Sequence, residues 1–266
     1  MRLNYKSFGE GSPVLILHGI LGMLDNWQHF AKLLAKDFHV IIADLRNHGR
    51  SPHSSVFDYQ VMQDDILELL KELGIEKTSI IGHSMGGKLA MHLALNNPEI
   101  VNELIVLDIA VKKYNTGHEY IFDIFSSINL QDFTTRKDIE KTLALSIHNY
   151  AIRQLLLKNI KRDKLTSSFA WKFNLEAIKN NYSKIIDAIT HDKAYAANCL
   201  FVRGGDSDYI TDEDVKDIKV LFPKATIETI AGAGHWIHAD KEELLYSLIS
   251  LYLTRMEFNK TPESEP

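Results

Sequence analysis

The hydrophobic pattern alternates short, largely apolar runs with stretches in which apolar residues recur at helical spacing. The runs occupy residues 14–17, 40–43, 78–81 and 104–107. Such runs are typical of strands buried on both faces. Between them we expect one helix capped by Asp25 or Asn26 and another carrying Met62, Ile66 and Leu69 on one face. The alternation predicts a parallel sheet with right-handed crossovers, and residues 3–8 predict an edge strand.

The alternation stops near residue 110. Residues 111–193 show helical patterns only, around residues 119–128, 137–148, 151–160 and 175–189, and the sheet pattern resumes at 199–203 and 225–230. We therefore expect an α/β core of residues 1–110 and 194–256, mostly parallel and flanked by helices. An all-helical lid of residues 111–193 would be inserted between two strands and cover the carboxyl ends of the sheet, where ligands bind in open α/β folds. Residues 257–266 are expected to form a disordered tail.

Composition narrows the class of protein. The chain has 266 residues, a net charge of −5 and no strong basic block, so nucleic acid is not an expected partner. Cys199 is the single cysteine, which excludes an internal disulfide framework and suits a reducing compartment; it lies in an apolar run. Neither a signal-peptide pattern nor an apolar run long enough for a membrane span is present, so we expect a cytoplasmic protein. Composition does not indicate the oligomeric state.

The strongest motif is Gly82-His83-Ser84-Met85-Gly86, which follows an apolar run and precedes a helical pattern. A G-x-S-x-G sequence between a strand and a helix is typical of a nucleophile elbow, in which the serine stands on a sharp, strained turn. The two glycines allow the strand and helix backbones to approach closely. We therefore interpret Ser84 as a nucleophile. The backbone N–H of Met85 would be one oxyanion donor.

A serine nucleophile requires a base, and the base requires an orienting acid. His235 follows the last predicted strand in a Gly-Ala-Gly loop and is the favoured base; His238 would fall at the start of a helix. Two acids stay open. Asp208 follows the penultimate strand, which is the commoner position and is slightly favoured, whereas Asp108 ends the strand after the elbow helix.

The loop after the first buried strand begins with His18-Gly19 and would supply a second oxyanion donor, the backbone N–H of Ile20. His18, Arg46 and Trp171 are candidate substrate-binding residues, although a loop arginine is more often a solvated charge. The chain contains no H-E-x-x-H metal motif and no glycine-rich nucleotide loop after a strand, so we expect neither a metal nor a cofactor.

Four segments resemble the α/β-hydrolase superfamily in order and spacing: HGILG at His18, DLRNHGRS at Asp44, GHSMGG at Gly82 and GAGHWIH at Gly232. The resemblance extends to about residue 256. Residues 44–51, 170–175 and 203–210 are similar more narrowly to the YbfF-like bacterial esterases, a branch with a mitochondrial relative in animals.

That branch implies hydrolysis of acyl esters or acyl-CoA thioesters without a cofactor. It carries an Asp-Ile-Ala segment where this chain has Asp108-Ile109-Ala110, which raises the weight of Asp108. In some relatives the position that matches Asp208 is not acidic. Val111 and Lys172 stand where members of that branch usually have proline and arginine, so the substrate preference stays open.

Three functions follow from these observations. The first is a serine esterase or thioesterase that acts on a small-molecule acyl substrate through an acyl-serine. The second uses the same residues for C–C bond hydrolysis, a menaquinone-pathway-type lyase reaction or perhydrolysis, because a fold does not fix a function. The third is a non-catalytic scaffold that binds a ligand; the presence of Ser84, an acid and His235 argues against it.

Overall fold

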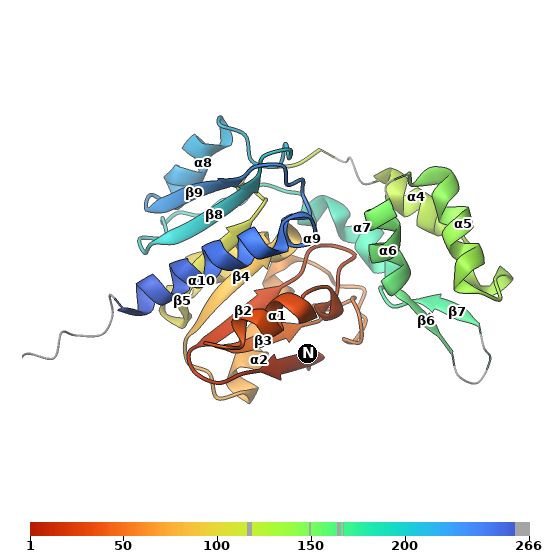
Figure 1. Ribbon diagram of the computed structural model, residues 1–266, viewed down its shortest axis with the longest axis horizontal. Coiled ribbons are helices and arrows are strands. Elements are labelled where there is room, and N and C mark those ends of the chain that lie inside the picture. The colour runs from red at the N-terminus through yellow and green to blue at the C-terminus, as the bar shows by residue number, and fades with distance from the viewer. Residues whose placement is uncertain (116–118, 149, 164–165, 167, 259–266) are drawn as a thin grey trace, which may run out of the picture.

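A seven-stranded sheet lies at the centre of the structure, a computed structural model that describes residues 1–115, 119–148, 150–163, 166 and 168–258 (Figure 1). In spatial order its strands are β1 (Tyr5–Phe8), β3 (His39–Ala43), β2 (Pro13–Leu17), β4 (Thr78–His83), β5 (Val101–Leu107), β8 (Cys199–Gly204) and β9 (Ala225–Ile230). β1 is antiparallel to β3, and every other pair is parallel. The predicted edge strand and mostly parallel sheet are confirmed.

Helices cover both faces of this sheet. Outside the segment between β5 and β8, they are α1 (Gln28–Leu34), α2 (Tyr59–Glu72), α3 (Met85–Asn96), α8 (Asp214–Leu221), α9 (Ile237–Asp240) and α10 (Glu242–Phe258), with 3₁₀ turns at Leu24–Asn26 and Pro98–Ile100. α2, α3 and α8 share a core with Leu15 and Leu17, whereas α1 and α10 share one with Val14 and Ile16. Figure 1 shows α1 and α10 on the same face of the sheet. Burial on both faces explains why the strands read as continuous apolar runs.

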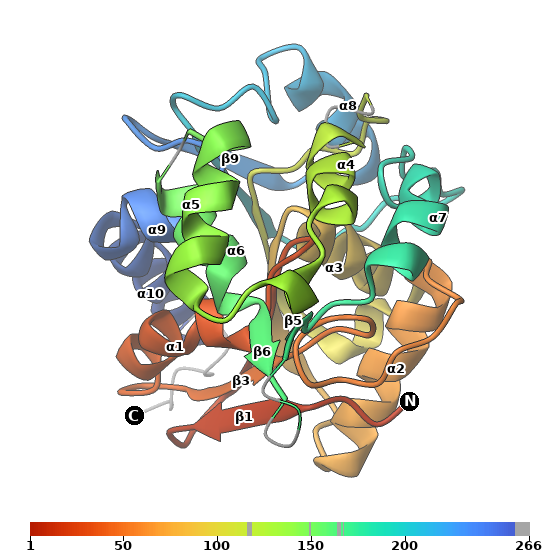
Figure 2. The ribbon, with the colours of Figure 1, turned by 90° about the vertical axis from the view of Figure 1, so that its right-hand side faces the viewer.

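The segment between β5 and β8 contains the remaining elements of the described residues. They are α4 (Glu119–Ser127), a 3₁₀ turn at Leu130–Asp132, α5 (Arg136–Ser146), α6 (Tyr150–Lys158), β6 (Ile160–Arg162), β7 (Phe169–Trp171) and α7 (Leu175–Ile185). In Figure 1 they stand beside the sheet, and in Figure 2, which views that side, α4, α5 and α6 lie in front of it.

The expectation of helices alone in this segment is wrong at one place. β6 and β7 form an antiparallel pair in which Ile160 lies opposite Trp171. Each strand spans three residues, which is too short for a two-residue period to be distinguished from a helical one. The predicted helix over residues 151–160 accordingly ends earlier, at Lys158.

Two helix ends also differ from the expectation. Asp25 and Asn26 do not cap α1; the carboxylate of Asp25 accepts a hydrogen bond from Lys6 Nζ, and Asn26 Oδ1 accepts one from the Met23 N–H. α10 continues through Phe258, so the tail cannot begin at residue 257, and residues 259–266 lie outside the described residues. Among the described residues, no helix combines the length and apolar character that a membrane crossing requires.

Candidate active site

The turn between β4 and α3 holds Ser84 in a strained conformation. Its φ of 53° and ψ of −118° lie outside the regions that side chains normally adopt, at a cost of about 1–3 kcal/mol. A Cβ on Gly82 would approach the backbone of Gly86 to under 3.0 Å, and one on Gly86 would approach the carbonyl of Leu17 equally closely. These two positions therefore require glycine. The strand–turn–helix context expected for the elbow is present.

The structure brings Ser84, His235 and Asp108 into one hydrogen-bonded chain. Ser84 Oγ lies 3.1 Å from His235 Nε2, and His235 Nδ1 lies 2.8 Å from Asp108 Oδ2. Ser84 follows β4, Asp108 follows β5 and His235 follows β9, so all three stand at carboxyl ends of parallel strands. Side chains from three distant parts of the chain thus meet at the edge of the sheet where α/β proteins bind ligands.

The carboxylate of Asp108 is fully buried and accepts three hydrogen bonds. Oδ1 accepts the Gly204 N–H at 3.0 Å, and Oδ2 accepts the Ser207 hydroxyl as well as His235 Nδ1. Because an ionised carboxylate can only accept, the imidazole proton must lie on Nδ1. Nε2 of His235 is then free to accept the proton of the Ser84 hydroxyl, which is the arrangement that a general base needs.

Asp208 occupies a different place from the one that the sequence argument slightly favoured. Its side chain is exposed and lines the cavity beside Ser84, and the hydrogen bonds of the described residues include none between Asp208 and His235. The turn after β8, closed by the Ser207 N–H on the Gly204 carbonyl, directs Ser207 rather than Asp208 toward the imidazole. The geometry therefore favours Asp108 and does not support the preference for Asp208.

The two expected oxyanion donors lie beside the serine. Ile20 and Met85 line the same cavity as Ser84. Outside the helix and strand ladders, the hydrogen bonds of the described residues leave both backbone N–H groups without an acceptor. Met85 also stands at the first position of α3, where the partial positive charge of the helix favours an anion. Both amides are thus available to a negatively charged oxygen.

His18 supports the loop after β2, and it is not among the residues that line the cavity. It is buried; its Nε2 accepts the Leu45 N–H at 3.0 Å and its Nδ1 donates to the Gly19 carbonyl. His48 stands edge-on to it with ring centroids 5.1 Å apart, and its Nε2 accepts the Leu21 N–H. Burial lowers the pKa of His18 to about 4 and that of His48 to about 3, so both rings are neutral at pH 7. The prediction that His18 binds substrate is not supported.

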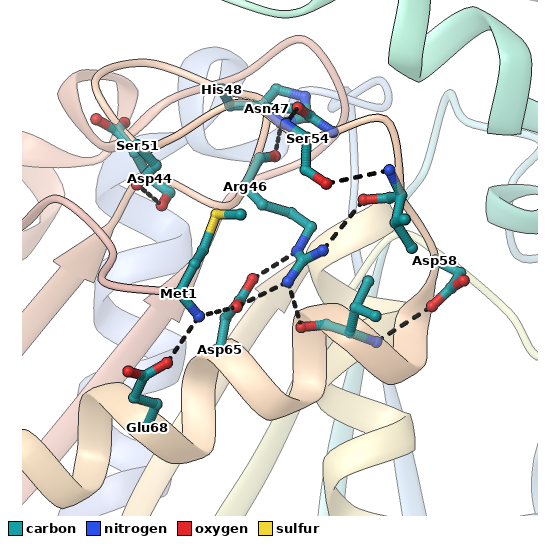
Figure 3. A network of polar contacts seen from close by, with 12 residues as sticks. Met1, Asp44, Arg46, Asn47, His48, Ser51, Ser54, Asp58, Asp65 and Glu68 are labelled. Atoms are coloured by element: carbon teal, nitrogen blue, oxygen red, sulfur yellow. Dashed lines mark hydrogen bonds and ion pairs between the residues drawn. The ribbon is translucent and has the colours of Figure 1, made fainter.

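Arg46 is buried, and its side-chain donors bond within the protein. Its guanidinium forms two hydrogen bonds with the buried carboxylate of Asp65, from Nε at 2.6 Å and from Nη2 at 2.8 Å (Figure 3). It also donates to the carbonyls of Val56 and Val61. The amino group of Met1 is a further donor to Asp65. Arg46 therefore fastens the loop after β3 to α2, and its donors are used away from the cavity.

Trp171, the third predicted substrate-binding residue, packs within an aromatic cluster. Its ring stacks on Phe173 with centroids 5.1 Å apart and meets Phe125 edge-on at 4.8 Å. It is not among the residues that line the cavity beside Ser84. The aromatic content of the inserted segment therefore serves its own packing at this position.

The cavity beside Ser84 has a volume of about 460 Å³. Its wall is mixed, with contributions from both the core and the inserted segment. The apolar and aromatic part includes Ile20, Ile109, Tyr182, Ile185, Ile186 and Tyr209, and the polar part includes Lys88, Lys112, Lys113, Asn115 and Asp208. Pockets of this size and character commonly bind small molecules with an apolar part. The arrangement places a cavity with both an apolar and a polar part next to a hydroxyl that has a base.

Three residues that contact His235 or Asp108 were not predicted from the sequence. The ring of Tyr209 stacks on His235 with centroids 3.6 Å apart, His83 donates from Nε2 to the His235 carbonyl at 2.8 Å, and Ser207 supports Asp108. His83 lay inside the recognised elbow motif, and Ser207 and Tyr209 flank Asp208. The available signal was therefore their position beside motif residues, not their chemical type.

This fold and this constellation define the class of the protein. The family model for the alpha/beta hydrolase fold matches residues 12–242, and the chain belongs to that family.

Individual relatives are similar over most of their length. Esterase YbfF of Escherichia coli is 33% identical over 245 residues, which cover 92% of this chain and 94% of the relative. The sn-1-specific diacylglycerol lipase ABHD11 of Xenopus tropicalis is 36% identical over 89% of this chain and 76% of its own length. A solved structure described as a marine microorganism esterase superposes with a TM-score of 0.91 at 41% identity, covering 93% of this chain and 98% of its own.

Proposed function

We propose that this protein is a serine hydrolase that cleaves acyl esters through an acyl-serine intermediate, with Ser84 as nucleophile, His235 as base and Asp108 as orienting acid. The observation that carries the proposal is the chain of contacts from Ser84 Oγ to His235 Nε2 at 3.1 Å and from His235 Nδ1 to Asp108 Oδ2 at 2.8 Å. Relatives named esterase and lipase, similar over most of this chain, support the choice of an ester substrate.

In the first half of the reaction, Ser84 Oγ attacks the acyl carbon and its proton passes to His235 Nε2. The negative charge on the former carbonyl oxygen is held by the N–H groups of Ile20 and Met85, each worth about 3 kcal/mol by analogy with other oxyanion holes. Collapse of this intermediate breaks the bond to the alcohol oxygen, which leaves with the proton from His235.

In the second half, a water molecule attacks the acyl-serine and gives a proton to His235 Nε2. The carboxylic acid leaves when Ser84 Oγ recovers that proton, so the enzyme returns to its starting state. The buried carboxylate of Asp108 stabilises the imidazolium at both stages and keeps the ring in its productive orientation. No cofactor is needed for any of these proton transfers.

Residues 111–193 act in this proposal as a cap that completes the acyl-binding cavity. Tyr182, Ile185 and Ile186 come from this segment and line the cavity together with Ser84. A thioester is a suitable substrate for the same residues, because the attack and the oxyanion are the same and the thiolate is the better leaving group. The acyl group would occupy the apolar part of the wall in either case.

The experiment compares wild type with Ser84→Ala on p-nitrophenyl esters and on a fluorophosphonate probe. We expect hydrolysis and covalent labelling of the wild type, and loss of both in Ser84→Ala, because the probe reacts only with an activated serine. Labelling without hydrolysis of any ester or thioester would reject the esterase and favour the C–C hydrolase or lyase. Absence of labelling in the folded wild type would reject serine catalysis altogether and favour the binding scaffold.

A further inference from the structure

Lys88 is a buried cation one helical turn beyond Ser84 on α3. Its side chain is 1% exposed, and the ion pairs of the described residues include none for its ammonium group. Nζ instead donates to the backbone carbonyls of Lys112, at 2.9 Å, and Asp187, and lies 5.2 Å from the centre of the Tyr114 ring. Burial lowers the pKa of Lys88 to about 7. A buried amino group without an ion-pair partner is costly to keep charged, so these carbonyls and the Tyr114 ring are the contacts that stabilise it.

The two carbonyls belong to the two ends of the inserted segment. Lys112 lies where the chain leaves β5 for the segment, and Asp187 lies where it returns after α7. These two connections, residues 111–114 and 186–189, are also bound to each other: the Tyr114 N–H donates to the Ile186 carbonyl and the Ile189 N–H to the Val111 carbonyl, both at 2.8 Å. We call these two connections together the hinge. Lys88 therefore fastens the hinge to α3, the helix that begins directly after Ser84.

The same hinge forms one wall of the cavity. Lys112, Tyr114 and Ile186 line it together with Ser84. A displacement of the hinge from α3 would therefore change the width of the space next to the nucleophile.

The hinge is also connected to the imidazole. The Tyr114 hydroxyl accepts the Ala110 N–H and donates to the Tyr209 carbonyl, both at 2.7 Å. Tyr114 stacks on Tyr209, which in turn stacks on His235. Tyr114 thus connects the hinge to Tyr209, whose ring packs on the proposed base His235.

We propose that Lys88 is a positioning residue: the hydrogen bonds from its side-chain amino group fasten both ends of the inserted segment to the nucleophile helix and thereby set the width of the acyl cavity. Its two side-chain hydrogen bonds both go to hinge carbonyls, so most of its donor capacity is used on the protein's own backbone. The effect on substrate selection rests on the proposed esterase function, whereas the fastening of the hinge does not.

The first test is kinetic and uses Lys88→Met, which keeps the length of the side chain but removes the donors. We expect KM for p-nitrophenyl octanoate to rise about tenfold while kcat and the parameters for p-nitrophenyl acetate change by less than about threefold, because only the long chain fills the cavity. Lys88→Arg restores charge and donors and should recover most of the loss. Lys184→Met, a change at an exposed lysine of α7, is the matched control and should behave as wild type.

The second test measures amide hydrogen exchange and requires no substrate. In Lys88→Met, the N–H groups of Tyr114 and Ile189 should exchange about tenfold faster, while the amides of β4 keep wild-type rates and so report an intact core. Unchanged exchange at both hinge amides would overturn the fastening role. Faster exchange with an unchanged ratio of octanoate to acetate KM would overturn the role in cavity width. If wild type hydrolyses no ester, the exchange measurement still decides the fastening role.

Discussion

Replacing Asp108 by asparagine would reverse the direction of the hydrogen bond between this side chain and His235 in the proposed triad. Oδ1 of Asp108 accepts the Gly204 N–H, which can only donate, so the amide oxygen of the asparagine must take that side. The amide NH₂ then faces His235 Nδ1, where Oδ2 now stands at 2.8 Å. Nδ1 becomes an acceptor, the ring proton moves to Nε2, and Nε2 presents a donor to Ser84. The imidazole can no longer accept the serine proton.

The size of the effect follows from how firmly the group is held. Asp108 is fully buried, and the backbone contact to Gly204 prevents the amide from rotating to restore the original direction of that hydrogen bond. In the serine-protease triad the same change leaves the geometry intact and lowers kcat about 10⁴-fold. We expect a similar loss in Asp108→Asn, equivalent to about 5.4 kcal/mol of transition-state stabilisation at 1.36 kcal/mol per tenfold.

The assay is kcat on p-nitrophenyl acetate for wild type, Asp108→Asn and Asp208→Asn, with circular dichroism to confirm folding. Asp208 is exposed, and the hydrogen bonds and ion pairs of the described residues include none between it and His235, so its replacement should change kcat by less than about threefold. The reverse pattern, a loss of about a thousandfold in Asp208→Asn with nearly normal kcat in Asp108→Asn, would refute the assignment of the acid.

Three further predictions concern stability. Gly82→Ala should lower the free energy of unfolding by about 3 kcal/mol in a urea titration, because the new Cβ would approach the Gly86 backbone to under 3.0 Å; a smaller loss than about 1 kcal/mol would contradict the packing argument. His18 and His48 have pKa values of about 4 and about 3 in the folded protein, below their unfolded value, so the unfolded chain binds more protons below about pH 6.5 and stability falls as the pH drops. Between pH 7 and pH 5 the two rings should cost about 4 kcal/mol together, and His48→Gln should remove about half of that dependence; an unchanged dependence would show that the ring is not held neutral. Arg46→Met should destabilise by about 3–5 kcal/mol because it leaves Asp65 buried with one cationic partner fewer, yet KM should stay unchanged; a raised KM would return Arg46 to the substrate-binding residues.

The sheet was predictable because strands that are buried on both faces consist mostly of apolar residues. Strands β2, β3 and β5 are almost wholly buried, so β2, β3 and the second half of β5 (residues 104–107) consist mostly of apolar residues, and the helices between the strands keep a regular period. The elbow was predictable because close backbone approach requires glycine at positions 82 and 86. The pair β6–β7 was not, since three residues are too few to show a period.

The roles of polar residues depended on neighbours that the sequence does not reveal. Arg46 and His18 stand in loops near the predicted ligand end of the sheet, which made them candidates for binding. Each instead forms hydrogen bonds with another loop or helix: Arg46 with the carboxylate of Asp65, and His18 with the backbone N–H of Leu45. A charged or titratable side chain in a loop is available to a ligand only if no closer partner exists, and those partners lie 19 and 27 residues away along the chain.

The choice between the two aspartates shows where the sequence argument must end. β5 and β8 are neighbours in the sheet, with Leu107 opposite Val202, so the loops that follow them meet at the same imidazole. Either loop could supply the acid, and the outcome is decided by one turn: the Ser207 N–H on the Gly204 carbonyl directs the hydroxyl of Ser207 inward and leaves Asp208 at the surface. The Gly204 N–H and the Ser207 hydroxyl then both donate to Asp108. The loop that holds the commoner acid position thus donates two hydrogen bonds to Asp108, the acid that the geometry favours, and the spacing of residues alone cannot show this.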